Sequence, residues 1–201
     1  MFCRFFDDLI RGFMMIDQLP ISQQCLFNTE RLSIERIKSQ VLDEKESNLL
    51  TVKVLELLTP AVTHSLPSEW QNITRLEDAN IWLQQRIEAS SFFAIRLRSS
   101  NDIIGFMFLY GDDEKLKLLD LHIGYLLGEV YWGKGYGSEL IKGLVDWAYL
   151  DEHIHSLVGG VEVANVGSIK VMEKNGFCLS TLKGPAEDVI FLEYVFNRLL
   201  Y

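Results

Sequence analysis

Apolar and polar residues recur with regular periods along most of the chain, and these periods predict its secondary structure. A period of two indicates strands, and apolar spacings of three and four indicate helices. Strands are predicted over 28–37, 92–98, 103–110, 118–127, 157–163 and 189–196. Helices are predicted over 43–58, 74–89, 135–149 and 167–175. Because strands outnumber helices early and alternate with them later, the pattern predicts an α+β domain with a mixed sheet.

Two of these elements show which of their faces is buried. In the strand 118–127, alternation puts His122 and Gly124 on one face. The opposite, apolar face carries Leu119, Leu121, Ile123, Tyr125 and Leu127. The helix 135–149 carries an apolar stripe of Leu140, Ile141, Leu144, Val145 and Ala148.

Local turn chemistry predicts where several elements begin and end. The residues from Ser99 to Asp102 are typical of a turn between two strands. Thr74 and Glu77 fit the capping-box pattern, which predicts a helix beginning there. That helix is expected to bury Leu76, Ile81 and Leu83. Gly176 is predicted to end the helix 167–175 in the left-handed conformation.

The composition restricts the class of protein. A chain of 201 residues with 48% hydrophobic residues indicates one globular domain with a short extension. The net charge of −9 argues against non-specific nucleic-acid binding. No apolar run reaches the roughly 18 residues of a membrane span. The three scattered cysteines form no metal-binding pattern, and they predict reduced thiols in the cytoplasm, with no metal site.

The first 28 residues are predicted to be an extension that precedes the domain. Apolar residues from Phe2 to Ile16 recur at helical spacing, which predicts a short amphipathic helix. Its apolar face could contact a second copy in a homodimer, a membrane surface or its own domain. Alternatively, the extension results from an upstream start codon ahead of Met14 or Met15.

A glycine-rich loop at 129–139 is the most informative stretch of the chain. It connects a predicted strand to a strongly amphipathic helix and contains Gly133, Gly135 and Gly137. Such glycines let a ligand approach the backbone closely. The helix N-terminus presents unpaired N–H groups and the positive end of the helix dipole. The loop therefore predicts a phosphate-binding site, to which Lys134 adds a positive charge.

Two nucleotide-binding motifs fit this loop poorly. The NTPase loop requires Ser or Thr after Gly133-Lys134, but Gly135 follows, so the hydroxyl that holds Mg²⁺ is absent. A dinucleotide fingerprint requires G-x-G-x-x-G, whereas the spacing here is G-x-G-x-G. The expected acidic residue about 20 positions downstream is also missing, since His155 stands there.

The segment Trp132-x-x-Gly135-x-Gly137 resembles the Q/R-x-x-G-x-G/A motif of the GCN5-related N-acetyltransferases (GNAT), with Trp in the Q/R position. That replacement resembles the RimJ/RimL-like branch, which acetylates ribosomal-protein N-termini. Three further segments agree with this branch, and the resemblance spans about residue 29 to the C-terminus. They are Thr29 to Leu32, Ile123 to Tyr125, and the N-x-x-S…K-x-G-F pattern from Asn165 to Phe177.

The resemblance implies a GNAT domain over 29–201, with a mostly antiparallel sheet flanked by helices. The sheet is expected to splay between the fourth and fifth strands, which are 118–127 and 157–163, and to hold acetyl-CoA in the gap. Asn165 is expected to contact the coenzyme, to cap the following helix, or both. The other expected coenzyme-binding residues are Leu127, Val130, Tyr131, Lys134, Gly135, Tyr136, Gly137 and Ser138.

The reaction implied by the resemblance is acetyl transfer from acetyl-CoA to a primary amine, either a protein N-terminal α-amine or a small amine. His122, acting through water, and Glu187 are the candidate bases. Met172 occupies the position where many relatives carry a tyrosine acid, so Ser168 is the candidate acid. Structural roles are the alternatives for all three candidates. The departure at Met172 also keeps open a non-catalytic acetyl-CoA sensor.

Overall fold

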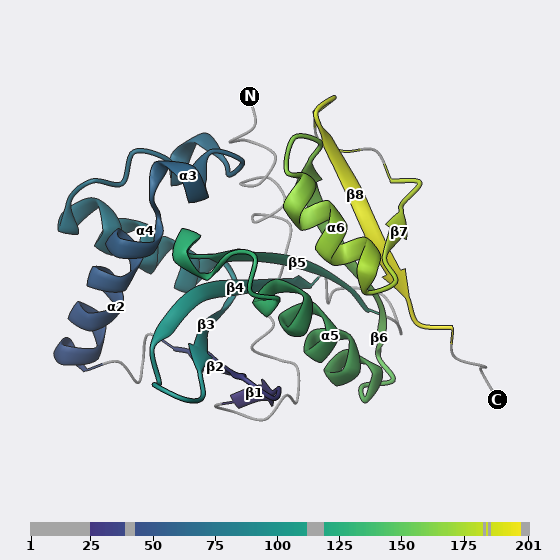
Figure 1. The fold of residues 1–201 in the computed structure, drawn as a ribbon, viewed down its shortest axis with the longest axis horizontal. Coiled ribbons are helices and arrows are strands. Elements are labelled where there is room, and N and C mark those ends of the chain that lie inside the picture. Colours follow the sequence, from purple (N-terminus) through teal and green to yellow (C-terminus); the bar gives the residue numbers. More distant parts are fainter. Residues whose placement is uncertain (1–24, 39–42, 112–118, 183, 185, 198–201) are drawn as a thin grey trace.

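The computed structural model describes residues 25–38, 43–111, 119–182, 184 and 186–197. Its centre is one eight-stranded sheet with the order β1-β2-β3-β4-β5-β6-β8-β7 (Figure 1). The strands are β1 (Cys25–Asn28), β2 (Leu32–Ile37), β3 (Ser91–Leu97), β4 (Ile103–Gly111), β5 (Leu119–Leu127), β6 (Ile154–Glu162), β7 (Cys178–Leu179) and β8 (Val189–Val195).

The sheet opens between β5 and β6, the one parallel pair among strands that otherwise pair antiparallel in the described chain. Their paired register ends at Ile123 and Gly159. Beyond it, β5 continues to Leu127 and β6 continues to Glu162. The expected splay is therefore confirmed. It lies between the fifth and sixth strands, because the single strand predicted over 28–37 is the hairpin β1–β2.

Helices cover both faces of the sheet (Figure 1). The helices are α2 (Glu44–Leu57), α3 (Pro60–Thr63), α4 (Leu76–Ala89), α5 (Tyr136–Tyr149) and α6 (Val166–Lys174), with short 3₁₀ turns η2 (Ser68–Trp70) and η3 (Glu129–Tyr131). One core cluster lies under α5 and includes its predicted stripe. The other lies under α2 and α4 and contains the aromatic group Trp70, Trp82, Phe92, Phe106 and Phe108. The predicted α+β class and the two faces of β5 are confirmed.

The start and the buried face of α4 differ from the prediction. Arg75 is the N-cap, and no side chain caps this helix, so the capping box of Thr74 and Glu77 does not form. Leu76 and Ile81 are exposed, and only Leu83 of the three predicted residues is buried. The buried face is Ala79, Trp82, Leu83, Arg86 and Ile87. These residues recur at helical spacing. The sequence did not reveal this buried face because it includes the charged Arg86.

The amphipathic helix predicted from Phe2 to Ile16 lies outside the described residues. Of the predicted extension, residues 25–28 are described, and they form β1 and pair with β2. In the described ranges, no helix has the length and apolar character needed to cross a membrane. The same ranges contain no group of three His, Cys, Asp or Glu side chains placed to hold a metal.

Candidate functional site

The glycine loop leaves the first N–H groups of α5 open. Gly135 is the N-cap with φ +82°, a conformation that side chains disfavour, and no side chain caps the helix. The N–H of Glu139 donates to the carbonyl oxygen of Gly135 at 3.0 Å. Within the described chain, no hydrogen bond uses the N–H groups of Tyr136, Gly137 or Ser138. These donors are therefore available to an anion.

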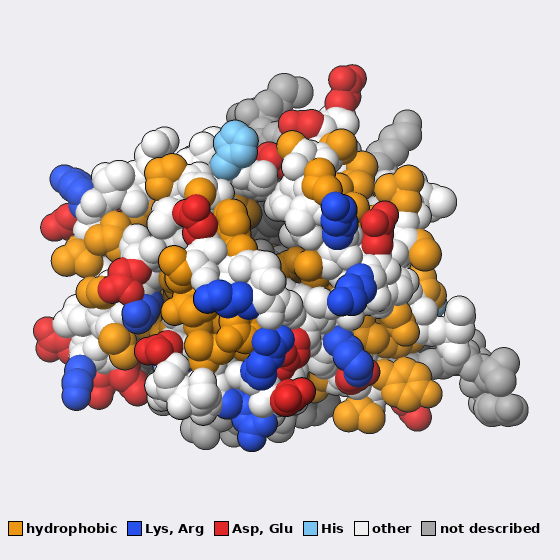
Figure 2. Space-filling model, viewed as in Figure 1, with side chains coloured by type: hydrophobic (Ala, Val, Ile, Leu, Met, Phe, Trp, Pro, Cys, Tyr) orange, Lys and Arg blue, Asp and Glu red, His pale blue; other side chains and the backbone are white. Residues whose placement is uncertain are grey.

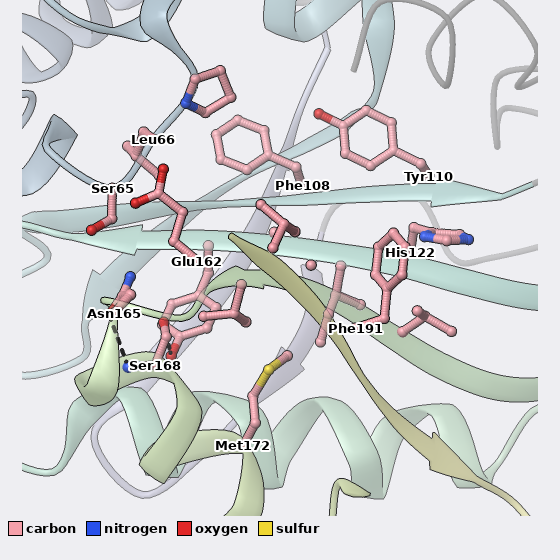
Figure 3. A pocket seen from close by; sticks show the side chains of 18 of the residues that line it. Ser65, Leu66, Phe108, Tyr110, His122, Glu162, Asn165, Ser168, Met172 and Phe191 are labelled. Atoms are coloured by element: carbon pink, nitrogen blue, oxygen red, sulfur yellow. Dashed lines mark hydrogen bonds between the residues drawn. The ribbon is translucent and has the colours of Figure 1, made fainter. Parts of the chain in front are cut away.

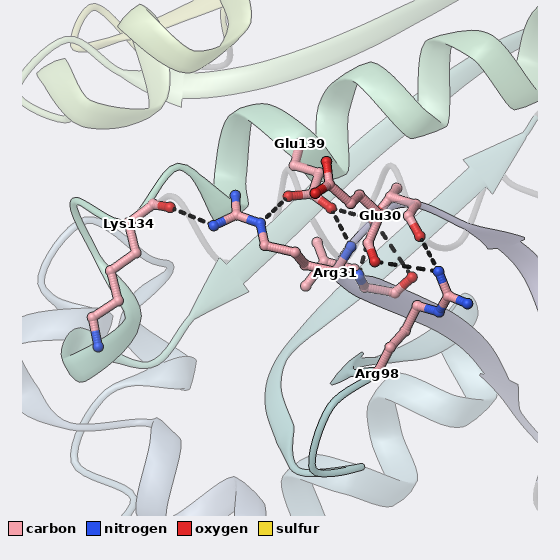
Figure 4. Close-up of polar contacts among 7 residues, drawn as sticks. Glu30, Arg31, Arg98, Lys134 and Glu139 are labelled. Atoms are coloured by element: carbon pink, nitrogen blue, oxygen red, sulfur yellow. Dashed lines mark hydrogen bonds and ion pairs between the residues drawn. The ribbon is translucent and has the colours of Figure 1, made fainter.

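The hairpin turn between β1 and β2 holds this loop in place (Figure 4). Arg31 Nε donates to Glu139 Oε2 at 2.6 Å, and Arg31 Nη1 donates to the carbonyl oxygen of Lys134 at 3.0 Å. The hydroxyl of Thr29 and the N–H of Arg31 both donate to Glu139 Oε1. The guanidinium also stacks 4.5 Å from the ring centroid of Tyr136. All of these contacts avoid the open N–H groups.

Trp132 closes the other side of the loop. Its indole Nε1 donates to the carbonyl oxygen of Leu127 at 2.7 Å, so the Trp in the Q/R position links the loop to the end of β5. Lys134 Nζ lies 5.8 Å from the ring centroid of Tyr131. Val130 points into solvent and is 71% exposed. The loop is thus fixed at both ends before any ligand binds.

A cleft of about 700 Å³ lies between this loop and α6. In Figure 2 the surface is hollowed between the part that carries α3 and the part that carries α6, with Lys and Arg side chains around the hollow. Val130 and Lys134 do not line the cleft, whereas Lys170 and Lys174 do and were missed. The predicted coenzyme-binding residues that line it are Leu127, Tyr131, Gly135, Tyr136, Gly137, Ser138 and Asn165.

At the inner end of the cleft, α6 meets β5. The side chain of Asn165 accepts a hydrogen bond from the N–H of Ser168 at 3.1 Å, so Asn165 is the helix N-cap, as one of its two predicted roles requires. Ser168 Oγ donates to the Tyr125 hydroxyl at 3.2 Å. Burial raises the pKa of Tyr125, so its hydroxyl stays protonated at neutral pH.

A second cavity of about 110 Å³ lies beside the cleft and is lined by residues of β4, β5, β6 and β8. Figure 3 shows His122 and Phe191 at one end and Ser65, Glu162 and Asn165 at the other. The buried Met172 also lines this cavity and offers no proton to a ligand. The cavity and the cleft share the wall formed by Ser65, Leu66, Tyr125, Asn165 and Ser168.

The two predicted bases lie in different surroundings. His122 lines the cavity, and burial lowers its pKa despite the opposing charges of Asp120 and Glu193. It is therefore neutral at neutral pH and able to accept a proton. Glu187 is exposed in the segment before β8 and lines neither the cavity nor the cleft.

Sequence reasoning missed two residues of these spaces, Tyr125 in the wall that the cavity shares with the cleft and Glu162 in the cavity alone. Alternation assigned Tyr125 to the core face of β5, where it indeed points, but that face opens into the cleft beyond the last pair with β6. Glu162 is the last residue of β6, three positions before Asn165. Its position at the end of a splayed strand is the signal that could have identified it.

Residues 51–178, more than half of the chain, match the family described as Acetyltransferase (GNAT) domain. The chain belongs to this GNAT family, and the resemblance found in its motifs is confirmed. Among curated relatives, the probable N-acetyltransferase YjcK of Bacillus subtilis (strain 168) is 33% identical over 96 residues, covering 47% of this chain and 52% of that protein. The uncharacterized N-acetyltransferase p20 of Bacillus licheniformis is 31% identical over 86 residues, covering 42% of this chain and 47% of that protein. The chain thus spans about half the length of these relatives.

Solved structures share the fold at low sequence identity. RimL, a ribosomal L7/L12 alpha-N-protein acetyltransferase in complex with coenzyme A, has a TM-score of 0.63 and 21% identity, covering 89% of this chain and 98% of that chain. The microcin C7 self-immunity acetyltransferase MccE, in complex with acetyl-CoA and AMP, has a TM-score of 0.63 and 18% identity, covering 83% and 93%. A GNAT acetyltransferase from Bacillus anthracis has a TM-score of 0.62 and 18% identity, covering 84% and 96%.

Proposed function

We propose that this chain transfers the acetyl group of acetyl-CoA to a primary amine by direct attack in a ternary complex. The observation that carries the proposal is the open N-terminus of α5, where the N–H groups of Tyr136, Gly137 and Ser138 face the cleft. This arrangement suits the diphosphate of a CoA thioester. Family membership supports the same reaction class.

The rest of the cleft suits the remaining parts of acetyl-CoA. Lys170 and Lys174 on α6 offer positive charge opposite the loop. The edge of β5 after Ile123 is released from pairing with β6, so its backbone groups are placed to bond the pantetheine arm. Asn165 lines the same stretch. The thioester then lies where the cleft meets the cavity, beside Tyr125 and Ser168.

The reaction needs a neutral amine as the nucleophile and an acid that protonates the leaving thiolate. His122 takes the amine's proton through water, since Figure 3 places it at the far end of the cavity from Ser168. The amine nitrogen forms a bond to the thioester carbon, and the carbon–sulfur bond breaks. Tyr125, held by Ser168, gives its proton to the sulfur. In this scheme Ser168 orients the acid, and Glu187 has no role.

The acceptor is inferred to be a protein N-terminal α-amine or a small amine. An α-amino group has a pKa near 7.7–8.0, so roughly a tenth is neutral at pH 7, whereas a lysine side chain near 10.4 is almost fully charged. A site with one remote base therefore favours the α-amine. RimL, whose fold this chain shares, is named as an α-N-protein acetyltransferase. As part of the proposal, we place the protein in the cytoplasm, as a monomer or a homodimer.

The test combines coenzyme binding with thiol release from acetyl-CoA in the presence of N-terminal peptides, polyamines, amino acids and aminoglycosides. Gly135→Asp should abolish acetyl-CoA binding, because it places a negative charge at the diphosphate site. Gly135→Asn is the matched control, since Asn has the same size, tolerates φ +82° and carries no charge. Equal affinity in the two variants would refute the loop assignment. Tight coenzyme binding without thiol release for any amine would identify the non-catalytic sensor instead.

A further inference from the structure

We propose that the acceptor is a primary amine attached to a compact apolar group of about four carbons, with its ammonium bound by Glu162. This inference rests on the proposed acetyl transfer and names the substrate class for it. The apolar group occupies the 110 Å³ cavity, and the amine lies at the wall that the cavity shares with the coenzyme cleft.

Most of the cavity wall is apolar and fixed by packing. Trp70, Phe108 and Phe191 line it together with aliphatic side chains. The Trp70 ring centroid lies 5.1 Å from that of Phe108, and the guanidinium of Arg86 lies 5.0 Å from the Trp70 ring centroid. An apolar cavity of about 150 Å³ holds benzene, so a cavity of this smaller size takes about four carbons.

A single carboxylate gives this apolar space its charge preference. Figure 3 shows Glu162 rising from the end of β6 with its carboxylate toward Ser65 and Leu66. Among the described residues, no ion pair or hydrogen bond to this carboxylate is formed, and no Lys or Arg lines the cavity. His122, the other titratable base in the wall, is neutral at neutral pH. An unpaired negative charge beside an apolar space selects a cation with an apolar body.

The position of Glu162 also orients the acceptor. The cavity end that carries Glu162 contains Asn165, which together with Tyr125 and Ser168 also lines the coenzyme cleft. An ammonium bound there lies next to the place assigned to the thioester. Its apolar group then extends toward Phe191 and leaves the end at His122 to the water through which that base takes the amine's proton.

Gly124 limits the room for that group. A Cβ at this position would lie 3.5 Å from Cδ2 of Phe108, which is ordinary contact, and it would project from the cavity wall. Gly124→Ala should therefore fold normally while occupying acceptor space. Gly124 is not one of the described glycines with a positive φ, so its backbone accepts a side chain without strain.

The first experiment compares acceptors of matched shape in thiol-release assays. Butylamine should exceed 3-aminopropan-1-ol, which replaces its methyl by a hydroxyl, by about 10- to 100-fold in kcat/KM. Methylamine should be poorer by at least about tenfold. Leucine amide and a tripeptide with N-terminal leucine carry a four-carbon isobutyl group on the carbon that bears the amine, and their rates relative to butylamine distinguish a small amine from a protein N-terminus. Equal or better use of the alcohol or of methylamine overturns the proposal.

The second experiment uses variants and does not depend on turnover. Binding of butylamine to protein saturated with coenzyme A is measured by calorimetry. Glu162→Gln should weaken it by about tenfold, because a charge-assisted bond is lost. Glu173→Gln, an exposed residue of α6 that lines neither space, is the matched control. Gly124→Ala should weaken butylamine binding more than ethylamine binding. Failure of wild-type binding, or no effect of Glu162→Gln, overturns this inference, whereas binding without acetylation would refute only the proposed acetyl transfer.

Discussion

The hydroxyl groups of Tyr125 and Ser168 lie 3.2 Å apart, although the two residues are 43 positions apart in the sequence. Tyr125 comes from β5 just after it separates from β6, and Ser168 comes from the first turn of α6. Because Ser168 donates to the tyrosine oxygen, the tyrosine proton is free to point elsewhere. The pair stands in the wall common to the coenzyme cleft and the small cavity.

Removal of the tyrosine hydroxyl should therefore slow chemistry without loosening the coenzyme. Tyr125→Phe should lower kcat by about 100-fold, the usual effect of losing a general acid, and leave the Kd of acetyl-CoA unchanged. Since burial raises the pKa of Tyr125 above 10.0, the wild-type enzyme should lose no rate to its ionisation below that pH. Ser168→Ala should have a smaller effect, because it removes only the orienting bond. An unchanged kcat in Tyr125→Phe would exclude Tyr125 as the acid.

The proposed role of His122 as the base predicts how the reaction rate depends on pH. Burial lowers the pKa of His122 below 6.5, against the opposing charges of Asp120 and Glu193. The neutral base accepts the proton, so the rate should fall as the pH drops through this lowered pKa and be independent of His122 above pH 6.5. His122→Gln should remove that acidic limb and lower kcat, with the Kd of acetyl-CoA unchanged. A rising limb centred above pH 6.5 that persists in the variant reports amine deprotonation instead.

The contact between Arg31 and Glu139 predicts an effect on coenzyme affinity. Arg31→Ala frees the carbonyl of Lys134 and the first turn of α5, and should weaken acetyl-CoA binding by about fivefold. That corresponds to about 1 kcal/mol, a value reduced for solvent screening because the Arg31 side chain is 43% exposed. Lys142→Ala, on the exposed side of α5, should leave affinity unchanged. Equal affinity of wild type and Arg31→Ala would show that the turn has no role in the site.

The contact between Arg31 and Glu139 also predicts that the stability of the protein depends on pH. Partial burial acts to raise the pKa of Glu139, but hydrogen bonds from Thr29 and Arg31 outweigh it and hold the pKa below 4.5. Its contribution to stability is therefore present above about pH 4.5 and is lost as the pH falls through the lowered pKa. Thermal melts of wild type and Glu139→Gln should differ at neutral pH and converge in acid.

The sequence predicted those elements whose signals are local. The helix 135–149, the glycine loop before it and the left-handed Gly176 all depend on residues within a few positions of one another, and all are confirmed. The capping box of Thr74 and Glu77 is also a local signal, but it does not form. The buried face predicted for α4 was wrong because it depends on a contact between distant segments. Its true face includes the buried Arg86, whose guanidinium lies over the ring of Trp70 from a separate turn.

The parts of the site that the sequence did not predict depend on contacts between distant segments. Each of these features forms only after two elements have packed together. They are the hydrogen bond from Ser168 to Tyr125, the ion pair of Arg31 with Glu139, and the position of Glu162 in the cavity wall. Residue type and spacing carry no information on such pairs. The cavity and the cleft meet at Tyr125, just after β5 stops pairing with β6, and the residue pattern of a strand does not show where its pairing ends.

The two lysines of α6 give a final prediction, on salt dependence. Lys170 and Lys174 line the cleft opposite the glycine loop, where the coenzyme phosphates are proposed to lie. Each lysine-to-alanine change should weaken acetyl-CoA binding by about threefold at low ionic strength, as expected for exposed charges. The difference from wild type should shrink as salt is added, because screening weakens exposed pairs. Lys142→Ala again serves as the control, since it removes an exposed lysine that does not line the cleft. Affinity that is unchanged in the double variant Lys170→Ala/Lys174→Ala at low salt would place the phosphates elsewhere.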